Sequence, residues 1–280
     1  MYGFAIEEKT AAAVHTLYPT LKNVAGERIR AELAKLLCGA HCGPILREYA
    51  EVFAFLIPPL GPCIGFDQRT PYHRWDVYEH LVRSVETVAP TEVLRLAMLL
   101  HDVGKPACFT LDAQGIGHAY GHQKRSAELA APVLDGLHPD NATRERVLLL
   151  VEYHDIDLAE DRRLLLRRLN RFGEEGLRQL IEVHRADAIA KGTVSPEEVN
   201  GWADGLISAL DALLAERPCF SLKELAVNGR DLLQAGVPKG PTLGQTLNTL
   251  LEQVMAGNLP NEREALLSAA RALTNGTDSI

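Results

Sequence analysis

The chain has 280 residues, of which 46% are hydrophobic and 24% are charged, and its formal net charge is -8. This length is enough to bury one or two cores, and the composition is typical of a water-soluble globular protein. The net negative charge disfavours a nonspecific nucleic-acid-binding protein, which needs clustered Lys and Arg, and leaves only a specific contact with a nucleic acid open. The longest apolar runs are far too short to cross a bilayer, so no membrane association is expected.

The five cysteines are scattered along the chain, and no signal peptide precedes them. An odd number of scattered cysteines favours reduced thiols and a cytoplasmic location over disulfides. Cys38 and Cys42, with His41 between them, could suggest zinc, but no second pair of ligands follows at the spacing of a zinc site. We therefore expect no metal at these cysteines.

Nearly every segment has helical periodicity, and runs of alternating β-branched residues are missing, so the sequence predicts an all-α fold. Residues 1–60 form a first helical region. Its helices are expected at 7–15, 27–37 and 45–56. Prolines and glycines between residues 58 and 71 then interrupt the helical pattern and indicate a linker.

The second region, residues 61–192, carries the most informative polar side chains. The helix expected over 74–88 has an apolar stripe with His80 beside it, where a histidine is either a core residue or a ligand. The next helix, over 91–102, is apolar and ends in His101-Asp102.

Glycine and proline after Asp102 stop this helix. An imidazole beside a carboxylate at its end is either a polar helix terminus in water or a pair of ligands for a divalent cation. Lys105 follows at once, and it either faces an anion or satisfies the last carbonyls of the helix.

Three later segments of this region repeat the theme. A helix that begins at His122 runs to about residue 134, and the helix over 143–153 ends in His154-Asp155. In the helix over 174–191, Asp187 lies on or beside an apolar face, where a carboxylate needs a partner. Between these helices, the arginine-rich stretch 162–171 is either a solvated helix face or a contact for RNA.

A third region, residues 193–280, is a helical tail. Its helices are expected at 196–216, 221–235, 241–256 and 261–273. Ser195 and Ser221 each precede a glutamate by three residues, which is the capping pattern of a helix start. Asn228-Gly229 indicates a turn within the second of these helices.

In chain order, the conspicuous residues are His80, His101-Asp102, His122, His154 and Asp187. This order resembles that of the HD superfamily of metal-dependent phosphohydrolases. The resemblance implies a helical bundle whose facing helices project nitrogen and oxygen ligands into one pocket. It also implies that His80, His101, Asp102 and Asp187 hold a first metal ion.

The same resemblance implies that Asp102 bridges to a second ion, if one is bound, held by His122 and His154. Such ligands suit Mn, Ni, Co or Fe, and less obviously Mg, so one or two divalent ions are expected per chain. The implied catalytic residues are Asp102, Lys105, which would contact a phosphate oxygen, and Asp155, which would orient His154 or accept a proton. The expected reaction is hydrolysis of a phosphomonoester or phosphodiester, with 2′,3′-cyclic nucleotides favoured.

The resemblance extends over almost the whole chain. Residues 27–33, 72–80, 227–232 and 236–241 look like the neck, HD and tail regions of bacterial CCA-adding tRNA nucleotidyltransferases and poly(A) polymerases. The nucleotidyl-transfer head is missing, because the only Asp-x-Asp, Asp155-Ile156-Asp157, follows a helix with no glycine turn before it. The Glu-Asp-x-x-Arg signature of nucleotide selection is also absent, so the chain should not add CCA by itself.

The rival hypothesis is a non-catalytic module that binds tRNA or a protein partner. The sequence indicates neither an oligomeric state nor whether the chain is a complete gene product.

Overall fold

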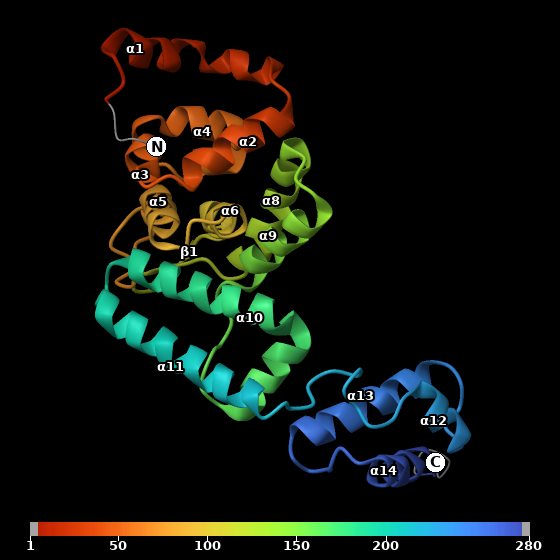
Figure 1. Ribbon diagram of the computed structural model, residues 1–280. Coiled ribbons are helices and arrows are strands. Elements are labelled where there is room, and N and C mark those ends of the chain that lie inside the picture. The colour runs from red at the N-terminus through yellow and green to blue at the C-terminus, as the bar shows by residue number, and fades with distance from the viewer. Residues whose placement is uncertain (1–4, 276–280) are drawn as a thin grey trace. The chain divides into compact units, whose positions relative to one another are not determined.

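The computed structural model describes residues 5–275, and its elements are almost all helices (Figure 1), which confirms the predicted all-α fold. Within that range the strands are β1 (Thr110–Leu111) and β2 (Gly117–His118), an antiparallel hairpin in which Thr110 pairs with His118. Contacts divide the chain into two units, residues 1–157 with 178–204, and residues 158–177 with 205–280. The three-region division at residues 60 and 192 stays a prediction.

The first unit begins with short helices. These are α1 (Glu8–Leu17), η1 (Tyr18–Asn23), α2 (Gly26–Leu37), α3 (Cys42–Glu48), α4 (Ala50–Leu56) and η2 (Pro58–Cys63), where η denotes a 3₁₀ helix. The single helix predicted over 45–56 is wrong, because the backbone leaves the helical region at Tyr49 (φ -113°, ψ 37°). The Tyr49 ring is buried and stacks on His15, so tertiary packing fixes the break.

Helices α1 and η1 are the least embedded of these elements, since none of their side chains is buried. A groove of about 1000 Å³, lined mainly by apolar side chains, lies among α1, α2 and α4. The first helix therefore rests on the unit with little packing of its own.

The core of the first unit surrounds α6. Helices α5 (Val77–Thr87), α6 (Glu92–Leu100), α8 (His122–Leu137) and α9 (Asn141–Tyr153) pack together (Figure 1), and α6 also contacts α2. Every residue from Leu94 to Leu100 is buried. A helix that is buried on all sides must be enclosed by others. The carboxyl end of α6 therefore lies inside the unit, and His101 and Asp102 follow directly.

A close contact between backbones joins this helix end to α8. The Gly104 N–H donates to the buried hydroxyl of Ser126, with N and Oγ 2.9 Å apart. A Cβ atom on Gly104 would lie 2.7 Å from the carbonyl oxygen of His122, so only glycine fits this contact. The short helix α7 (Lys105–Cys108) then leads to the β1–β2 hairpin.

Helices α10 (Arg162–Lys191) and α11 (Pro196–Ala215) each contribute residues to both units. The arginine-rich stretch is helical, and α10 continues through it to Lys191 with a kink at Gly173, whose φ is 69°. In the first unit, residues 178–191 of α10 carry Asp187.

The second unit contains α12 (Gly229–Gln234), α13 (Pro241–Met255) and α14 (Arg263–Asn275), which share an apolar core. The helix predicted to start at Ser221 is wrong, because α12 begins after Asn228, whose side chain forms a capping box with Asp231. Asn261 accepts a hydrogen bond from the Ala226 N–H and donates to the Glu224 carbonyl, which holds residues 224–226 out of a helix. Among the described helices, none combines the length and the apolar character needed to cross a bilayer.

Candidate metal centre

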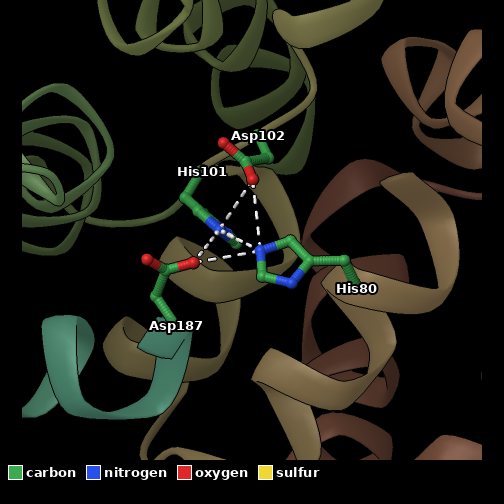
Figure 2. Close-up of side chains that lie close together, drawn as sticks. All are labelled: His80, His101, Asp102 and Asp187. Carbon is green, nitrogen blue, oxygen red and sulfur yellow. Dashed lines mark hydrogen bonds and ion pairs between the residues drawn. The ribbon is translucent and has the colours of Figure 1, made fainter. Parts of the chain in front are cut away.

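Four buried side chains of the first unit converge on one point (Figure 2): His80 of α5, His101 and Asp102 after α6, and Asp187 of α10. The His80 Nε2 atom lies 3.2 Å from Asp102 Oδ2 and 3.0 Å from Asp187 Oδ1. The His101 Nε2 atom lies 3.2 Å and 3.4 Å from the same two oxygens. The two Nε2 atoms are themselves 3.2 Å apart.

This spacing fits donors that share one ion. Ligand atoms about 2.1 Å from a common ion lie about 3.0 Å apart as octahedral neighbours and about 3.4 Å apart in a tetrahedron. Two imidazoles and two carboxylates are a donor set that divalent transition metals favour. The four residues therefore have the composition and spacing of a divalent metal site.

The tautomers of three histidines also fit metal binding. His101, His122 and His154 each place Nδ1 2.8 Å from the backbone carbonyl oxygen three residues earlier. Because a carbonyl only accepts, Nδ1 carries a proton, so Nε2 faces the cluster and is the atom that can offer a lone pair to a metal ion. Metal-binding histidines are commonly oriented by a bond of this kind.

A second group of potential ligands shares Asp102 with the first. Asp102 Oδ1 lies 3.0 Å from His122 Nε2 and 3.6 Å from His154 Nε2. One carboxylate oxygen thus faces each group, and these three residues form a further candidate site. The structure brings together all six residues predicted as ligands, while their binding of metal stays a prediction.

Two lysines compensate the buried carboxylates. The Lys105 Nζ atom lies 2.6 Å from Asp102 Oδ2, and Lys191 Nζ lies 2.7 Å from Asp187 Oδ2. Burial alone would raise the pKa of both carboxyls. The positive charges of Lys105 and His101 beside Asp102, and of Lys191 beside Asp187, outweigh burial and hold each pKa well below its usual range. Both aspartates are therefore ionised.

The pKa values of the buried histidines His101 and His154 are shifted in opposite directions. Burial lowers the pKa of His101, but the adjacent carboxylates of Asp102 and Asp187 outweigh it and raise the pKa to about 9. Burial and the neighbouring His101 lower the pKa of His154 to about 3, which keeps that ring neutral. A metal ion would replace the proton that His101 otherwise holds.

A pocket of about 270 Å³ opens onto the cluster and is lined by Asp102, Lys105, His154 and Asp155, among others. Lys105 is buried and also bonds to Gln68 and His73. The Nδ1 of His154 is held by the Val151 carbonyl, whereas Asp155 accepts a hydrogen bond from Gln123. The Val151 carbonyl, rather than Asp155, is therefore the group that orients the His154 ring. A proton-accepting role for Asp155 stays a prediction.

Sequence reasoning missed several residues that line this pocket, including Gln68, Tyr72, Tyr120 and Lys191. Lys191 follows Asp187 by four residues on one helix, a spacing that predicts an ion pair. The other three lie in loops and have no periodic signal. Cys38 and Cys42 belong to neither of the potential metal groups found among the described residues.

Fold and site together define an all-α protein built around a buried cluster of histidines and aspartates with the geometry of a divalent metal centre. The family described as "tRNA nucleotidyltransferase domain 2" matches residues 124–270, more than half of the chain, and the chain therefore belongs to it. Residues 3–59 match the family described as "RNA and SrmB-binding site of polymerase A". The resemblance to tRNA nucleotidyltransferases is thus confirmed, whereas the HD phosphohydrolase classification stays a prediction.

Individual proteins are similar over most of the chain. An A-adding tRNA nucleotidyltransferase of Deinococcus radiodurans is 30% identical over 94% of this chain and 63% of its own length. A CC-adding tRNA nucleotidyltransferase of Thermus thermophilus is 32% identical over 86% of this chain and 55% of its own length. A multifunctional CCA protein of Azoarcus is 28% identical over 71% of the chain and 51% of its own length. The chain spans only part of each relative.

Proposed function

We propose that this chain is a metal-dependent phosphohydrolase of the HD class that cleaves a phosphomonoester or a phosphodiester, with 2′,3′-cyclic nucleotides as the first candidates. The observation that carries the proposal is the convergence of four buried donors, His80, His101, Asp102 and Asp187, beside an open pocket. A divalent ion bound there would activate water and stabilise negative charge on the phosphoryl oxygens.

The protein's own groups suit a phosphate ester in that pocket. Lys105 and Lys191 both line it, and their ammonium groups attract an anion. Asp102 presents one oxygen to each group of histidines, which fixes the rings of both groups around one carboxylate. Asp155 is exposed at the pocket wall, where its carboxylate can accept a proton from water.

The direct test is hydrolysis of 2′,3′-cyclic AMP and of a generic phosphodiester with added Mn²⁺, Ni²⁺, Co²⁺ or Mg²⁺. The native chain should bind metal and turn over substrate, and Asp102→Ala should lose both. Glu145→Gln is the matched control, since this carboxylate is exposed on α9 and lies outside the pocket lining. Absence of turnover with every metal, from protein shown to be folded, would contradict the proposal for these substrates.

A second candidate function is tRNA binding, supported by the names of the relatives and by one feature of the second unit. There a cavity of about 600 Å³ is lined by Arg163, Arg167 and Arg171 of α10 and by polar side chains of α13, including Asn248. These side chains are exposed. Three arginines at four-residue spacing beside a hollow can follow a phosphate backbone.

The test is the affinity of the full chain for tRNA as a function of salt. Replacing both Arg163 and Arg167 by Glu should weaken binding and reduce the slope of log K against log salt by roughly 2. The same change at Lys239 and Arg271, exposed residues of the same unit outside this cavity, should have a smaller effect. Equal effects of the two double variants would contradict a specific role for the cavity.

A further inference from the structure

Two aromatic side chains at the metal pocket are unusually exposed. Among the described residues, the large hydrophobic side chains with the greatest exposed fractions are Tyr120 at 78% and Tyr72 at 71%. Both line the pocket that opens onto the His/Asp cluster. Aromatic rings contribute most to binding when they are covered, so two exposed rings beside one candidate site indicate a surface for a ligand.

Tyr120 has the form of a flat stacking surface. Its ring lies on the ring of His118, with centroids 5.2 Å apart and planes within 6° of parallel. The Tyr120 hydroxyl also lies 3.3 Å from His118 Nδ1. One face of the tyrosine is thus supported by the histidine, and its high exposure leaves the other face open.

The β1–β2 hairpin holds this pair of rings in place. Asp112 Oδ2 lies 2.9 Å from His118 Nε2, and Asp112 Oδ1 accepts the N–H groups of Gln114 and Ile116 at the hairpin turn. The Asp112 carboxylate therefore fixes both the turn and the histidine. It also fixes the tautomer, because Nε2–H donates to Asp112 and leaves Nδ1 to accept the Tyr120 hydroxyl.

A second contact fixes the hairpin to the pocket wall. The Gly117 N–H donates to the Arg69 carbonyl, with N and O 2.8 Å apart, and a Cβ on Gly117 would lie 2.1 Å from the Gln68 carbonyl oxygen. Phe109 packs edge-on against Phe66 just before the hairpin, with ring centroids 5.2 Å apart. The stacking surface is therefore ordered before any ligand arrives, which lowers the entropic cost of binding.

We propose that Tyr120, supported by His118, stacks on the base of a nucleotide whose phosphate lies at the His/Asp cluster. The inference rests on the proposed function, because it takes the phosphate site from there and adds the selection of a base-bearing substrate. Every nucleobase offers a flat ring to an aromatic side chain, and such stacking is tolerant of sequence. Tyr120 is then the residue that distinguishes nucleotides from simple phosphate esters.

The test compares 5′-AMP with ribose 5-phosphate, in which a hydroxyl replaces the base, each used as its non-hydrolysable methylene phosphonate and titrated calorimetrically into the Mn²⁺-loaded full chain. Native protein should bind AMP about tenfold more tightly than ribose 5-phosphate. Tyr120→Ala should remove that difference while leaving the affinity for ribose 5-phosphate unchanged, and Tyr120→Phe should keep it. Leu111→Ala is the matched control, because Leu111 is exposed on the same hairpin but does not line the pocket.

The outcomes separate this inference from the proposed function. If the chain prefers AMP in a way that depends on Tyr120 but hydrolyses no phosphate ester, the base site is supported and the proposed hydrolase activity is contradicted. Equal affinity for the two ligands, no binding of AMP, or a preference that survives Tyr120→Ala would overturn the inference. A short RNA with a 5′-terminal adenylate identifies the source: binding tighter than that of AMP assigns the surface to an RNA end, and equal or weaker binding to free nucleotides.

Discussion

Gly104→Ala tests whether the contact between the end of α6 and the start of α8 holds the site together. The added Cβ would lie 2.7 Å from the His122 carbonyl oxygen and 2.7 Å from the Ser126 nitrogen. Both are backbone atoms and cannot rotate away, so the first turn of α8 must move and must take His122 with it. Overpacking of this kind costs about 1–3 kcal/mol, or roughly 2–12 °C in melting temperature.

The assay is thermal unfolding of Gly104→Ala without metal, followed by titration with Mn²⁺. The displaced His122 should weaken the second group of ligands more than the first, so metal bound per chain should fall if the native chain binds two ions. Gly136→Ala is the matched control on the same helix, because its Cβ meets nothing within 4 Å. That change should stabilise α8 by about 0.5–1 kcal/mol. Equal melting temperatures for Gly104→Ala and the native chain would refute the reasoning.

Three other outcomes are expected. Mn²⁺ at about 100 times its dissociation constant should add about 2.7 kcal/mol to the free energy of unfolding and raise the melting temperature by roughly 5–10 °C, and EDTA should reverse the rise. Ser126→Ala leaves the Gly104 N–H without its acceptor and should cost about 1–3 kcal/mol, measured by urea unfolding. His184→Leu should reduce the loss of stability between pH 7 and pH 5, measured by thermal unfolding, because burial lowers the pKa of His184.

The sign of the His184 effect follows from linkage. In the folded protein the ring takes up a proton only at a lower pH, while the unfolded chain takes one up as the pH falls below the ordinary pKa of about 6.5. Stability from this residue is therefore complete above that pH and declines below it. An unchanged pH dependence of stability in His184→Leu would contradict a contribution from His184.

The control for Ser126→Ala is Ser84→Ala. The Ser84 hydroxyl only donates to a carbonyl of its own helix, so its loss should cost less stability. An unchanged melting temperature at saturating metal would contradict the first expectation.

Much of the fold around the site could be predicted from periodicity, because that part of the chain buries regular apolar stripes. The apolar stripe of α5 predicted the position of His80 beside the core, and the apolar run of α6 predicted that His101 and Asp102 follow a buried helix. Side chains that are polar but lie beside such stripes are the ones a folded core forces together. Periodicity placed these residues on their helices, whereas their convergence on one pocket was implied by the resemblance to the HD superfamily, and their binding of metal stays a prediction.

The rest depended on contacts between residues far apart in the sequence. The capping pattern at Ser221 forms locally, since Glu224 accepts the Ser221 N–H. Asn261 nevertheless hydrogen-bonds the backbone of residues 224 and 226, so no helix follows the cap. The hairpin has strands of two residues each, too short for alternation to be recognised. Tyr120 could not be identified because the exposure of a loop residue is decided by tertiary structure alone.

The absence of buried side chains on α1 affects the dynamics of the native chain. Because α1 buries none of its side chains, it can separate from the first unit without exposing the core around α6. Such an opening costs far less free energy than global unfolding. Backbone amides of α1 should therefore exchange with solvent deuterium faster than those of α5, α6 and α9, and hydrogen exchange should show at least two levels of protection within one folded unit.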